Sequence, residues 1–322
     1  MRRFSKNNNK RRKRARISLT TEGMESLSQT ERRSPCDICG CVELKDLYVA
    51  QDRLGSDRRQ FTISQCGGCG VLRTFPVMSD IELAEFYPEE YWGEEPSKEW
   101  IVRSQSEKTS FLDETSIRGG RILDLGCGSG YFLRALDGSR WDRFGVETGS
   151  AAVEAARRHL GDEKVIEGSL GDSHFDDDSF DVITFWSSLE HMNHPGVALH
   201  EAHRILKADG RLIIQLPNAG GYQLRLFKGN WFALDAPRHR YHFSEKVLRR
   251  FLSENRFAIE KITFSSKEHN AHALRQSLKS KLSTPVVGRA AYLLIKPFTT
   301  PVDTLISNRG HGATITLIAR KT

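Results

Sequence analysis

Residues 121–130, which read RILDLGCGSG, decide the fold of this chain of 322 residues. A short apolar run ends in a loop with glycine at alternate positions, and a helical pattern with Phe132, Leu133 and Leu136 on one side follows it. Short apolar runs that alternate with helical patterns are typical of a parallel sheet with helices on both faces. The stretch therefore predicts the first strand, the ligand-binding turn and the first helix of an α/β domain.

The same alternation continues from this stretch to the C-terminus. Helical patterns cover 150–160, 195–207 and 244–252, and apolar runs typical of strands cover 121–125, 143–147, 164–166, 180–186, 211–216, 257–264 and 313–320. The sequence thus predicts an α/β fold with a doubly wound, mostly parallel, seven-stranded sheet. Ligands of such sheets bind at the carboxyl ends of the strands.

The basic charge of the chain lies almost entirely in its first 33 residues. The formal net charge is +7, but residues 1–33 hold 11 of the 48 lysines and arginines and 3 of the 41 acidic residues. The other residues therefore carry 37 basic and 38 acidic side chains. This balance argues against nucleic acid as a partner of the folded body. We predict a disordered basic tail at 1–33. One alternative is that the tail binds nucleic acid or an anionic membrane as a tether; the other is that it is a solvated extension without a partner.

The composition is that of a chain that can bury a core, with 38% hydrophobic and 28% charged residues. No apolar run approaches the roughly 18 residues of a membrane span. No apolar segment follows the basic N-terminus, as it would in a secretory signal. We therefore expect a cytoplasmic protein.

Two pairs of cysteines, each followed by glycine, stand near the N-terminus with a spacer of 26 residues between them. Each C-x-x-C-G turn lets two thiolates reach one ion, so the predicted ligands of a structural Zn²⁺ are Cys36, Cys39, Cys66 and Cys69. Cys41 is a spare thiol that could replace Cys39. Disulfides are the alternative, although nothing indicates an oxidising compartment. We expect a zinc-ribbon-like module at 34–80, stabilised by its metal because it is too small for an apolar core of its own.

The rest of the chain divides into two parts. Residues 81–118 are expected to form a linker and a helical lead-in, and residues 119–322 the α/β domain. Aromatic, arginine and histidine residues gather at 217–243, so we expect this segment to lie over the carboxyl edge of the sheet as a substrate-binding lid. A helical insertion is expected at 266–310, as a further lid, a contact with a membrane surface or a face for self-association.

The glycine loop is suited to a particular class of ligand. A dinucleotide fingerprint needs a small residue three positions after the second glycine, where this chain has Tyr131. Asp124, two residues before the first glycine, would repel a phosphate and attract an ammonium group. Glu147 ends the second strand, where a carboxylate can accept hydrogen bonds from both ribose hydroxyls. The two acids favour a cationic, phosphate-free nucleoside over a dinucleotide.

Four motifs, in this order, resemble those of class I S-adenosylmethionine-dependent methyltransferases. They are the glycine loop at 122–130, the acidic motif at 145–147, the F-D-x-V/I…L-E-H signature at 180–191, and the turn at 206–212, where Ala208 and Asp209 replace the usual Pro and Gly. The resemblance covers about residues 105–260 and implies a Rossmann-like methyltransferase fold with S-adenosylmethionine as cofactor. The cysteine module before it is similar to that of bacterial methyltransferases that modify glycans or natural products.

The resemblance also implies which residues hold the cofactor. The methionine end would lie against Asp124, Gly126, Cys127, Gly128 and Gly130. The ribose would be bound by Glu147, with Thr148 beside it, and the adenine would be bordered by Ser169 and Leu170. The residues that would face the sulfonium are Trp186 and Ser187.

Transfer of a methyl group to a hydroxyl or a carbon also needs a base with a pKa near neutrality, which favours histidine. The candidates are His191, just after the fourth strand, and His239 in the lid, with Asp235 to orient it. The alternatives are that His191 braces the next loop and that Asp235 pairs with Arg238.

We predict a methyltransferase that acts on a small-molecule acceptor such as a sugar, a glycan or a lipid-linked intermediate. One alternative is an RNA methyltransferase that holds RNA through the zinc module and the basic tail, against which the neutral body argues. The other is a non-catalytic cofactor-binding protein.

Overall fold

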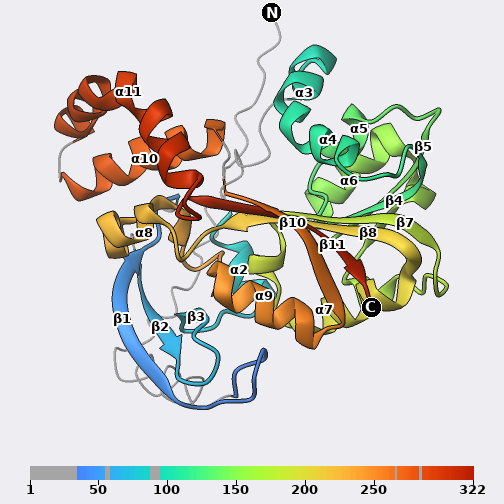
Figure 1. Cartoon of the computed structure of the whole chain (residues 1–322), viewed down its shortest axis with the longest axis horizontal. Coiled ribbons are helices and arrows are strands. Elements are labelled where there is room, and N and C mark those ends of the chain that lie inside the picture. Colours follow the sequence, from blue (N-terminus) through green and yellow to red (C-terminus); the bar gives the residue numbers. More distant parts are fainter. Residues whose placement is uncertain (1–34, 55–58, 88–94, 265–266, 283–284) are drawn as a thin grey trace, which may run out of the picture.

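The computed structural model describes residues 35–54, 59–87, 95–264, 267–282 and 285–322. They form a sheet of seven strands and a sheet of four, with helices around them (Figure 1). The basic tail predicted at 1–33 lies outside the described residues.

The larger sheet has the strand order β10-β11-β8-β7-β4-β5-β6. β4 to β8 run parallel, whereas β11 pairs antiparallel with β8, and β10 pairs antiparallel with β11. The predicted seven-stranded, mostly parallel sheet is thus confirmed. Its strands are β4 (Gly120–Leu125), β5 (Trp141–Glu147), β6 (Val165–Glu167), β7 (Phe180–Trp186), β8 (Leu206–Pro217), β10 (Phe257–Thr263) and β11 (Thr314–Lys321).

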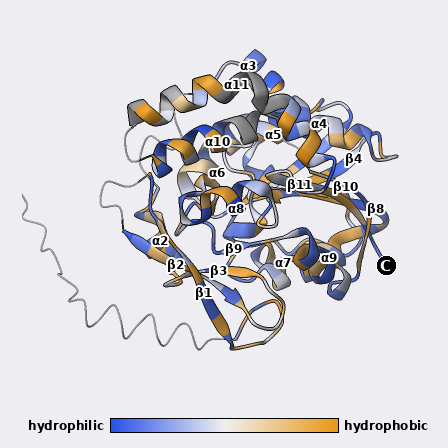
Figure 2. Ribbon diagram, turned by 60° about the vertical axis from the view of Figure 1, so that its left-hand side comes forward, coloured by the Kyte–Doolittle hydropathy of each residue, from blue (hydrophilic) through white to orange (hydrophobic). Residues whose placement is uncertain are grey.

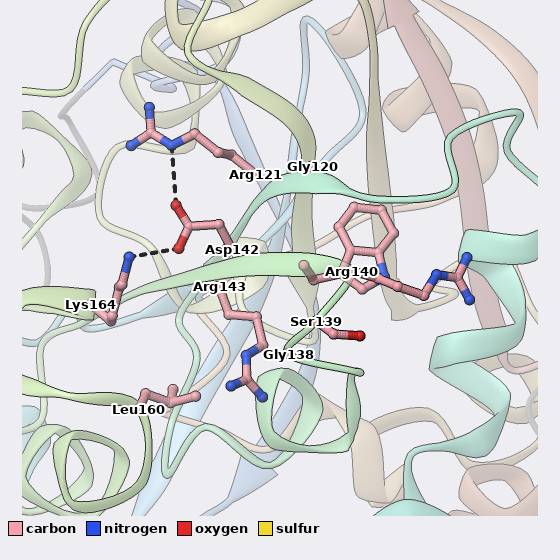
Figure 3. A pocket seen from close by; sticks show the side chains of 10 residues that line it. Gly120, Arg121, Gly138, Ser139, Arg140, Asp142, Arg143, Leu160 and Lys164 are labelled. Atoms are coloured by element: carbon pink, nitrogen blue, oxygen red, sulfur yellow. Dashed lines mark hydrogen bonds and ion pairs between the residues drawn. The ribbon is translucent and has the colours of Figure 1, made fainter.

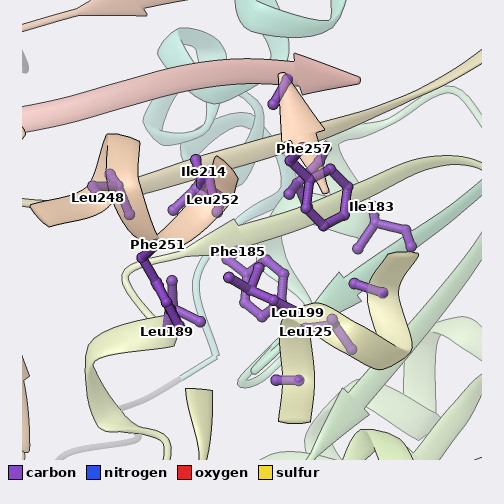
Figure 4. Close-up of a cluster of buried hydrophobic side chains, with 14 of the residues drawn as sticks. Leu125, Ile183, Phe185, Leu189, Leu199, Ile214, Leu248, Phe251, Leu252 and Phe257 are labelled. Carbon is purple, nitrogen blue, oxygen red and sulfur yellow. The ribbon is translucent and has the colours of Figure 1, made fainter. Parts of the chain in front are cut away.

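Both faces of this sheet are covered by helices. Successive residues of a strand point to opposite faces, so neighbouring residues of one strand belong to two different cores. One face packs on α7 (Pro195–Ile205) and α9 (Glu245–Glu254) through a set of strand residues that includes Leu123, Ile183 and Ile214 (Figure 4). The preceding residue of each strand belongs to the core on the other face, as Ile122, Val182 and Ile213. That face packs on α4 (Ser106–Asp113), α5 (Tyr131–Ala135) and α6 (Ser150–Leu160). The helix α3 (Lys98–Ser104) precedes α4.

The smaller sheet joins two segments that are far apart in the chain. β1 (Leu44–Gln51), β2 (Gln60–Cys66) and β3 (Leu72–Phe75) come from the predicted zinc module, and β9 (Tyr241–His242) comes from the predicted lid. β9 pairs antiparallel with β3, and the Thr74 hydroxyl donates to the carbonyl oxygen of His239 at 2.6 Å. The module and the lid therefore share one sheet.

An apolar core joins the same two segments. Phe61 and Ile63 of β2 pack with Leu224 and Phe227 of α8 (Tyr222–Phe227) and with Trp231, and all five side chains are buried. Burial of this much apolar surface stabilises the contact between module and lid. The lid is therefore fixed by packing as well as by β-pairing.

A fully buried arginine connects the lid to the module and to the linker. Arg238, whose side chain is 0% exposed, donates to Asp52 Oδ1 at 3.0 Å and to the two carboxylate oxygens of Asp235 at 2.5 and 3.0 Å. Its Nη1 also donates to the carbonyl oxygen of Phe86 at 2.9 Å. A buried charge needs paired and hydrogen-bonded partners of this kind to offset the loss of its hydration.

We expect the substitution Arg238→Met to lower the free energy of unfolding by about 3–5 kcal/mol, because it leaves buried carboxylates without their arginine. Denaturant unfolding measures this change. Arg249→Met is the matched control, since Arg249 pairs with Glu245 on an exposed part of α9 and should cost less than about 1 kcal/mol. Equal losses in the two variants would contradict the importance of the buried ion pair.

Two helices occupy the segment where an insertion is predicted, α10 (Lys267–Lys281) and α11 (Pro285–Ser307), and they pack on each other. Figure 2 shows hydrophobic residues along α11. Its exposed large apolar side chains include Val287, Leu293, Leu294, Val302 and Leu305. Among the described residues, no helix has the length and apolar character needed to cross a membrane.

Candidate functional site

The glycine loop lies between the end of β4 and the start of α5. Gly126 and Gly130 each have a φ of +74°, and Gly128 has +53°, in the left-handed region that favours glycine. A Cβ at Gly126 would lie 2.5 Å from the Cβ of Ser188, and a Cβ at Gly130 would lie 3.3 Å from that of Ala156. The loop thus brings bare backbone to the carboxyl edge of the sheet.

Glu147, the last residue of β5, turns its carboxylate toward this loop. Its Oε2 accepts from the amide of Gly128 at 2.9 Å, and its Oε1 accepts from the amides of Thr148 and Gly149 at 2.8 and 2.9 Å. Hydrogen bonds from amides to a carboxylate are stronger than those between neutral groups. Glu147 therefore holds the loop in shape and keeps a negative charge beside it.

Asp124, the second acid, is buried at the end of β4. Its Oδ1 accepts from the hydroxyl of Thr184 at 2.8 Å. Burial raises the pKa of Asp124 to about 6, although the nearby ammonium of Lys108 acts in the opposite direction. At neutral pH most of this carboxyl is still ionised, so two negative charges flank the loop.

Lys108 was not predicted as part of the site. It belongs to α4, and its Nζ lies 5.6 Å from the ring centroid of Trp186. Burial lowers the pKa of Lys108, while Asp124 favours its charged form. No motif surrounds Lys108 in the sequence, so only the fold brings it to Asp124.

Three further residues of the predicted cofactor site have side chains that are engaged within the protein. Cys127 is buried against β5, because a Cβ at Gly145 would lie 2.6 Å from its Sγ. Ser169 donates from its amide and its hydroxyl to Asp172 Oδ2, at 2.8 and 2.6 Å, and so caps the short helix η3 (Leu170–Asp172). Leu170 itself is buried. Contact with the cofactor through the backbone of these residues stays a prediction.

Trp186 and Ser187 lie at the end of β7, close to the loop. The indole of Trp186 packs with Phe111 and Phe132, at centroid distances of 6.2 and 5.2 Å. Ser187 has a φ of +53°, which is uncommon for a residue other than glycine. The hydroxyl of the next residue, Ser188, donates to the carbonyl oxygen of Leu125. The end of β7 is thereby tied to the start of the glycine loop.

The two predicted histidines meet beyond this strand end. The ring centroids of His191 and His239 lie 4.5 Å apart and the rings are nearly perpendicular. His191 Nδ1 donates to the carbonyl oxygen of Arg238 at 3.0 Å, and His239 Nδ1 donates to that of Ala233 at 2.9 Å. Burial lowers the pKa of His191 to about 3 and that of His239 to about 4. Both imidazoles are therefore neutral at physiological pH.

Two acids lie next to His239, and they differ in their partners. Asp235 Oδ2 and Glu190 Oε1 are each 4.0 Å from His239 Nε2. Both oxygens of Asp235 accept from Arg238, which is the pairing that the sequence left open. Because Nδ1 of His239 is bonded to a carbonyl, Asp235 does not orient the ring through that nitrogen. Glu190 is buried, was not among the predicted site residues, and has its pKa raised to about 8 by burial.

The four predicted metal ligands also lie together. Their four sulfur atoms lie within 4.8 Å of one another. The Sγ atoms of Cys36 and Cys69 are 3.9 Å apart, and those of Cys39 and Cys66 are 3.5 Å apart. Four sulfurs about 2.3 Å from a zinc ion would be about 3.8 Å apart in a tetrahedron. Gly40 and Gly70, after the pairs, have φ of +71° and +80°, so each turn needs its glycine. Cys41 lies beside Gly68, outside this group of four.

A pocket on the opposite edge of the sheet is separate from these sites. It surrounds the amino ends of β4 and β5, and Asp142 there pairs with Lys164 at 2.6 Å and Arg121 at 3.8 Å (Figure 3). The glycine loop lies at the carboxyl ends of the same strands. The pocket is therefore not part of the candidate cofactor site.

Comparisons with known proteins bear on this geometry. The profile of the methyltransferase-domain family matches residues 98–262. The demethylmenaquinone methyltransferase of Clavibacter sepedonicus is 37% identical over 101 residues, which are 30% of this chain and 41% of that protein. The ubiquinone biosynthesis O-methyltransferase of Alkalilimnicola ehrlichii is 30% identical over 109 residues, 32% of this chain and 43% of that one. A solved SAM-dependent methyltransferase of Archaeoglobus fulgidus is 18% identical with a TM-score of 0.48, and the match covers 72% of this chain and 97% of that chain.

The matched part of the chain spans about two fifths of the length of these two curated relatives. The family match takes in just over half of the chain, including β4 to β8, the glycine loop, Glu147 and the L-E-H residues. The chain therefore belongs to the methyltransferase-domain family.

Proposed function

We propose that the protein transfers a methyl group from S-adenosylmethionine to a small-molecule acceptor. The observation that carries this proposal is the pair of carboxylates at the glycine turn, Asp124 at the end of β4 and Glu147 beside the loop. The ammonium group of the methionine moiety complements Asp124, and the ribose hydroxyls complement Glu147. A pyrophosphate would meet two negative charges at the same place.

The bound cofactor supplies an electrophilic methyl group on a sulfonium, so the protein has to align the acceptor and exclude water. The glycine loop holds the methionine end through its backbone, next to Asp124. The end of β7, with Trp186 and Ser187, borders the site where Trp186 packs on α4 and α5. Burial lowers the pKa of His191 to about 3 and that of His239 to about 4, well below the near-neutral value of an efficient general base, so these imidazoles are weak proton acceptors for a hydroxyl.

The class of acceptor is inferred from the relatives and from charge. The two curated relatives are named for ubiquinone biosynthesis and for demethylmenaquinone, which are small organic molecules. The part of the chain after residue 33 has almost no net charge, which does not favour RNA. We therefore propose a small hydroxylated acceptor, a class that includes the sugar and lipid-linked acceptors that the sequence suggests.

We further propose that the four-cysteine cluster holds a structural Zn²⁺. Sulfur separations close to those of a tetrahedral site support this role, as do the two glycine turns. Such an ion would stabilise the loops at the ends of β1 to β3, the strands on which β9 of the lid pairs. A contact of 266–310 with a membrane surface or a second copy, and a cytoplasmic location, stay predictions; the exposed leucines of α11 support the contact.

Incubation of the protein with methyl-labelled S-adenosylmethionine tests the proposed activity. We expect label in the small-molecule fraction of a cell extract and at least about 100-fold less in total RNA from the same cells. The Asp124→Asn variant should lower the labelling about 10-fold or more, because a charge-assisted contact to the cofactor contributes about 1.5–3 kcal/mol. Label in RNA alone would favour an RNA methyltransferase, and cofactor binding without any transfer would favour a non-catalytic protein.

A further inference from the structure

Three side chains beyond the end of β7, two of them buried and one partly buried, converge in a way that binding of the cofactor does not require. Glu190, His191 and His239 each place one potential ligand atom within 4.8 Å of the other two. Glu190 and His191 belong to the short helix η4 (Leu189–His191), whereas His239 comes from the lid just before β9. The fold thus brings three residues of metal-ligating types to one point from two distant segments.

The two imidazoles are held in the same tautomer. A carbonyl oxygen only accepts hydrogen bonds, so Nδ1 of His191, bonded to Arg238 O, and Nδ1 of His239, bonded to Ala233 O, both carry the hydrogen. The lone pair of each neutral ring is therefore on Nε2. A histidine that binds a metal through one nitrogen usually donates from the other to a carbonyl or carboxylate in this way.

Apart from its own backbone amide, the side chain of Glu190 has no hydrogen-bond donor among the described residues. Both of its side-chain oxygens are buried, and the residue is 1% exposed. Ionisation of a buried carboxyl with so few donors is costly, because the charge loses its water and gains little in return. Its Oε1 lies 4.0 Å from Nε2 of His239, too far for a hydrogen bond but close enough for both atoms to share one ion.

We propose that Glu190, His191 and His239 bind a divalent transition-metal ion, separate from the zinc site of the four cysteines. Two imidazoles and one carboxylate are a donor set that suits Zn²⁺, Fe²⁺, Mn²⁺ or Co²⁺ better than Mg²⁺ or Ca²⁺, which prefer oxygen. Donor atoms about 2.0–2.2 Å from an ion are about 3.3–3.6 Å apart in a tetrahedron. The 4.0 Å separation of His239 and Glu190 closes to that value with a small movement of each side chain.

The other basic side chains near the cluster already have hydrogen-bond partners. Arg238 directs its guanidinium to Asp52 and Asp235, and the guanidinium of Arg240 donates to Asp80 and to the carbonyl oxygen of His191. His242 uses its Nε2 in a hydrogen bond with Thr74 Oγ1 at 3.0 Å. None of these contacts supplies a donor to the Glu190 side chain. A bound cation would satisfy its carboxylate and the two imidazole lone pairs at once.

The role of the ion in catalysis rests on the proposed function, but its binding does not. Three protein ligands leave coordination positions open, and a hydroxyl bound there has a lowered pKa. An acceptor hydroxyl at such a position would lose its proton to solvent and present its oxygen to the methyl group. In that arrangement the two histidines act as ligands rather than as bases.

Cobalt binding to the full chain tests this proposal without cofactor or acceptor. After dialysis against Co²⁺, we expect two ions per wild-type chain by mass spectrometry and one in Glu190→Gln or His239→Gln. The near-ultraviolet absorption that only cobalt–thiolate bonds give should stay unchanged in these variants, since it reports on the cysteine site. The affinity of the second ion should fall at least about 100-fold when a ligand is removed.

His242→Gln is the matched control and should keep two ions, because His242 is buried beside the cluster but bonds to Thr74. Calorimetric affinity for S-adenosylmethionine checks that each variant is folded and that the proposed cofactor site is intact. A wild-type chain that binds cobalt only at the thiolates would overturn the proposal. Retention of the second ion in both Glu190→Gln and His239→Gln would overturn it as well.

Discussion

The Glu147→Ala variant is expected to bind S-adenosylmethionine about 100-fold more weakly than the wild-type chain. Two hydrogen bonds from ribose hydroxyls to a carboxylate contribute about 3 kcal/mol in total, which corresponds to that factor. The substitution also removes the acceptor of the amides of Gly128, Thr148 and Gly149, so the loop loses part of its support. Isothermal titration calorimetry measures the affinity directly.

Glu167→Ala is the control for this experiment. Glu167 ends β6 at the same edge of the sheet and accepts from the hydroxyl of Ser150, but, unlike Glu147, it accepts no hydrogen bond from the glycine loop in the described part of the chain. Its removal takes away the same charge and should change the affinity less than about 3-fold. Equal losses in the two variants would mean that net charge at this edge, rather than the position of Glu147, governs binding.

The Cys66→Ser variant is expected to lose its zinc ion and at least about 100-fold of its methyl-transfer rate. Cys66 ends β2, and structural zinc ions supply a large part of the folding free energy of small modules. Without the ion, the strands that pair with β9 lose their support, and the lid over the carboxyl edge becomes disordered. The affinity for S-adenosylmethionine should change far less, because Asp124 and Glu147 belong to the larger sheet.

Metal analysis, rate measurement and limited proteolysis of the same preparation check these three parts of the prediction. Cys41→Ser is the matched control, since Cys41 is the neighbouring thiol outside the group of four. It should keep one zinc ion in the cysteine site and the full rate. Loss of zinc in Cys41→Ser together with its retention in Cys39→Ser would instead make Cys41 the ligand, the replacement that the sequence allows.

Boundaries of elements were less predictable than their existence. β8 begins at Leu206, not at residue 211, because the backbone after α7 already pairs with Phe180 before the register shifts between Phe180 and Val182. The turn residues 207–210 read Lys-Ala-Asp-Gly, without a large apolar side chain, so their pattern in the sequence indicates a loop. Pairing with a neighbouring strand overrides such local preferences.

The lid shows most clearly where local patterns stop being informative. Its histidines, arginines and aromatic residues predicted a substrate-binding segment, and the sequence left open whether Asp235 orients His239 or pairs with Arg238. The structure shows the pair, with Arg238 buried between Asp235 and Asp52. Asp52 lies in the module, 186 positions earlier in the chain, so no spacing within the lid could reveal it.

By itself, the sequence determined the order of strands and helices, the glycine loop with its two acids, and the two cysteine turns. Each of these follows from residues only a few positions apart, whose periodicity, backbone freedom and charge act locally. The tertiary structure alone shows that β9 completes the module's sheet, that Lys108 lies near enough to Asp124 to act on its charge, and that Glu190 lies beside His239. These contacts depend on how packed elements place distant side chains together, and burial then sets the pKa of each group through the loss of its hydration.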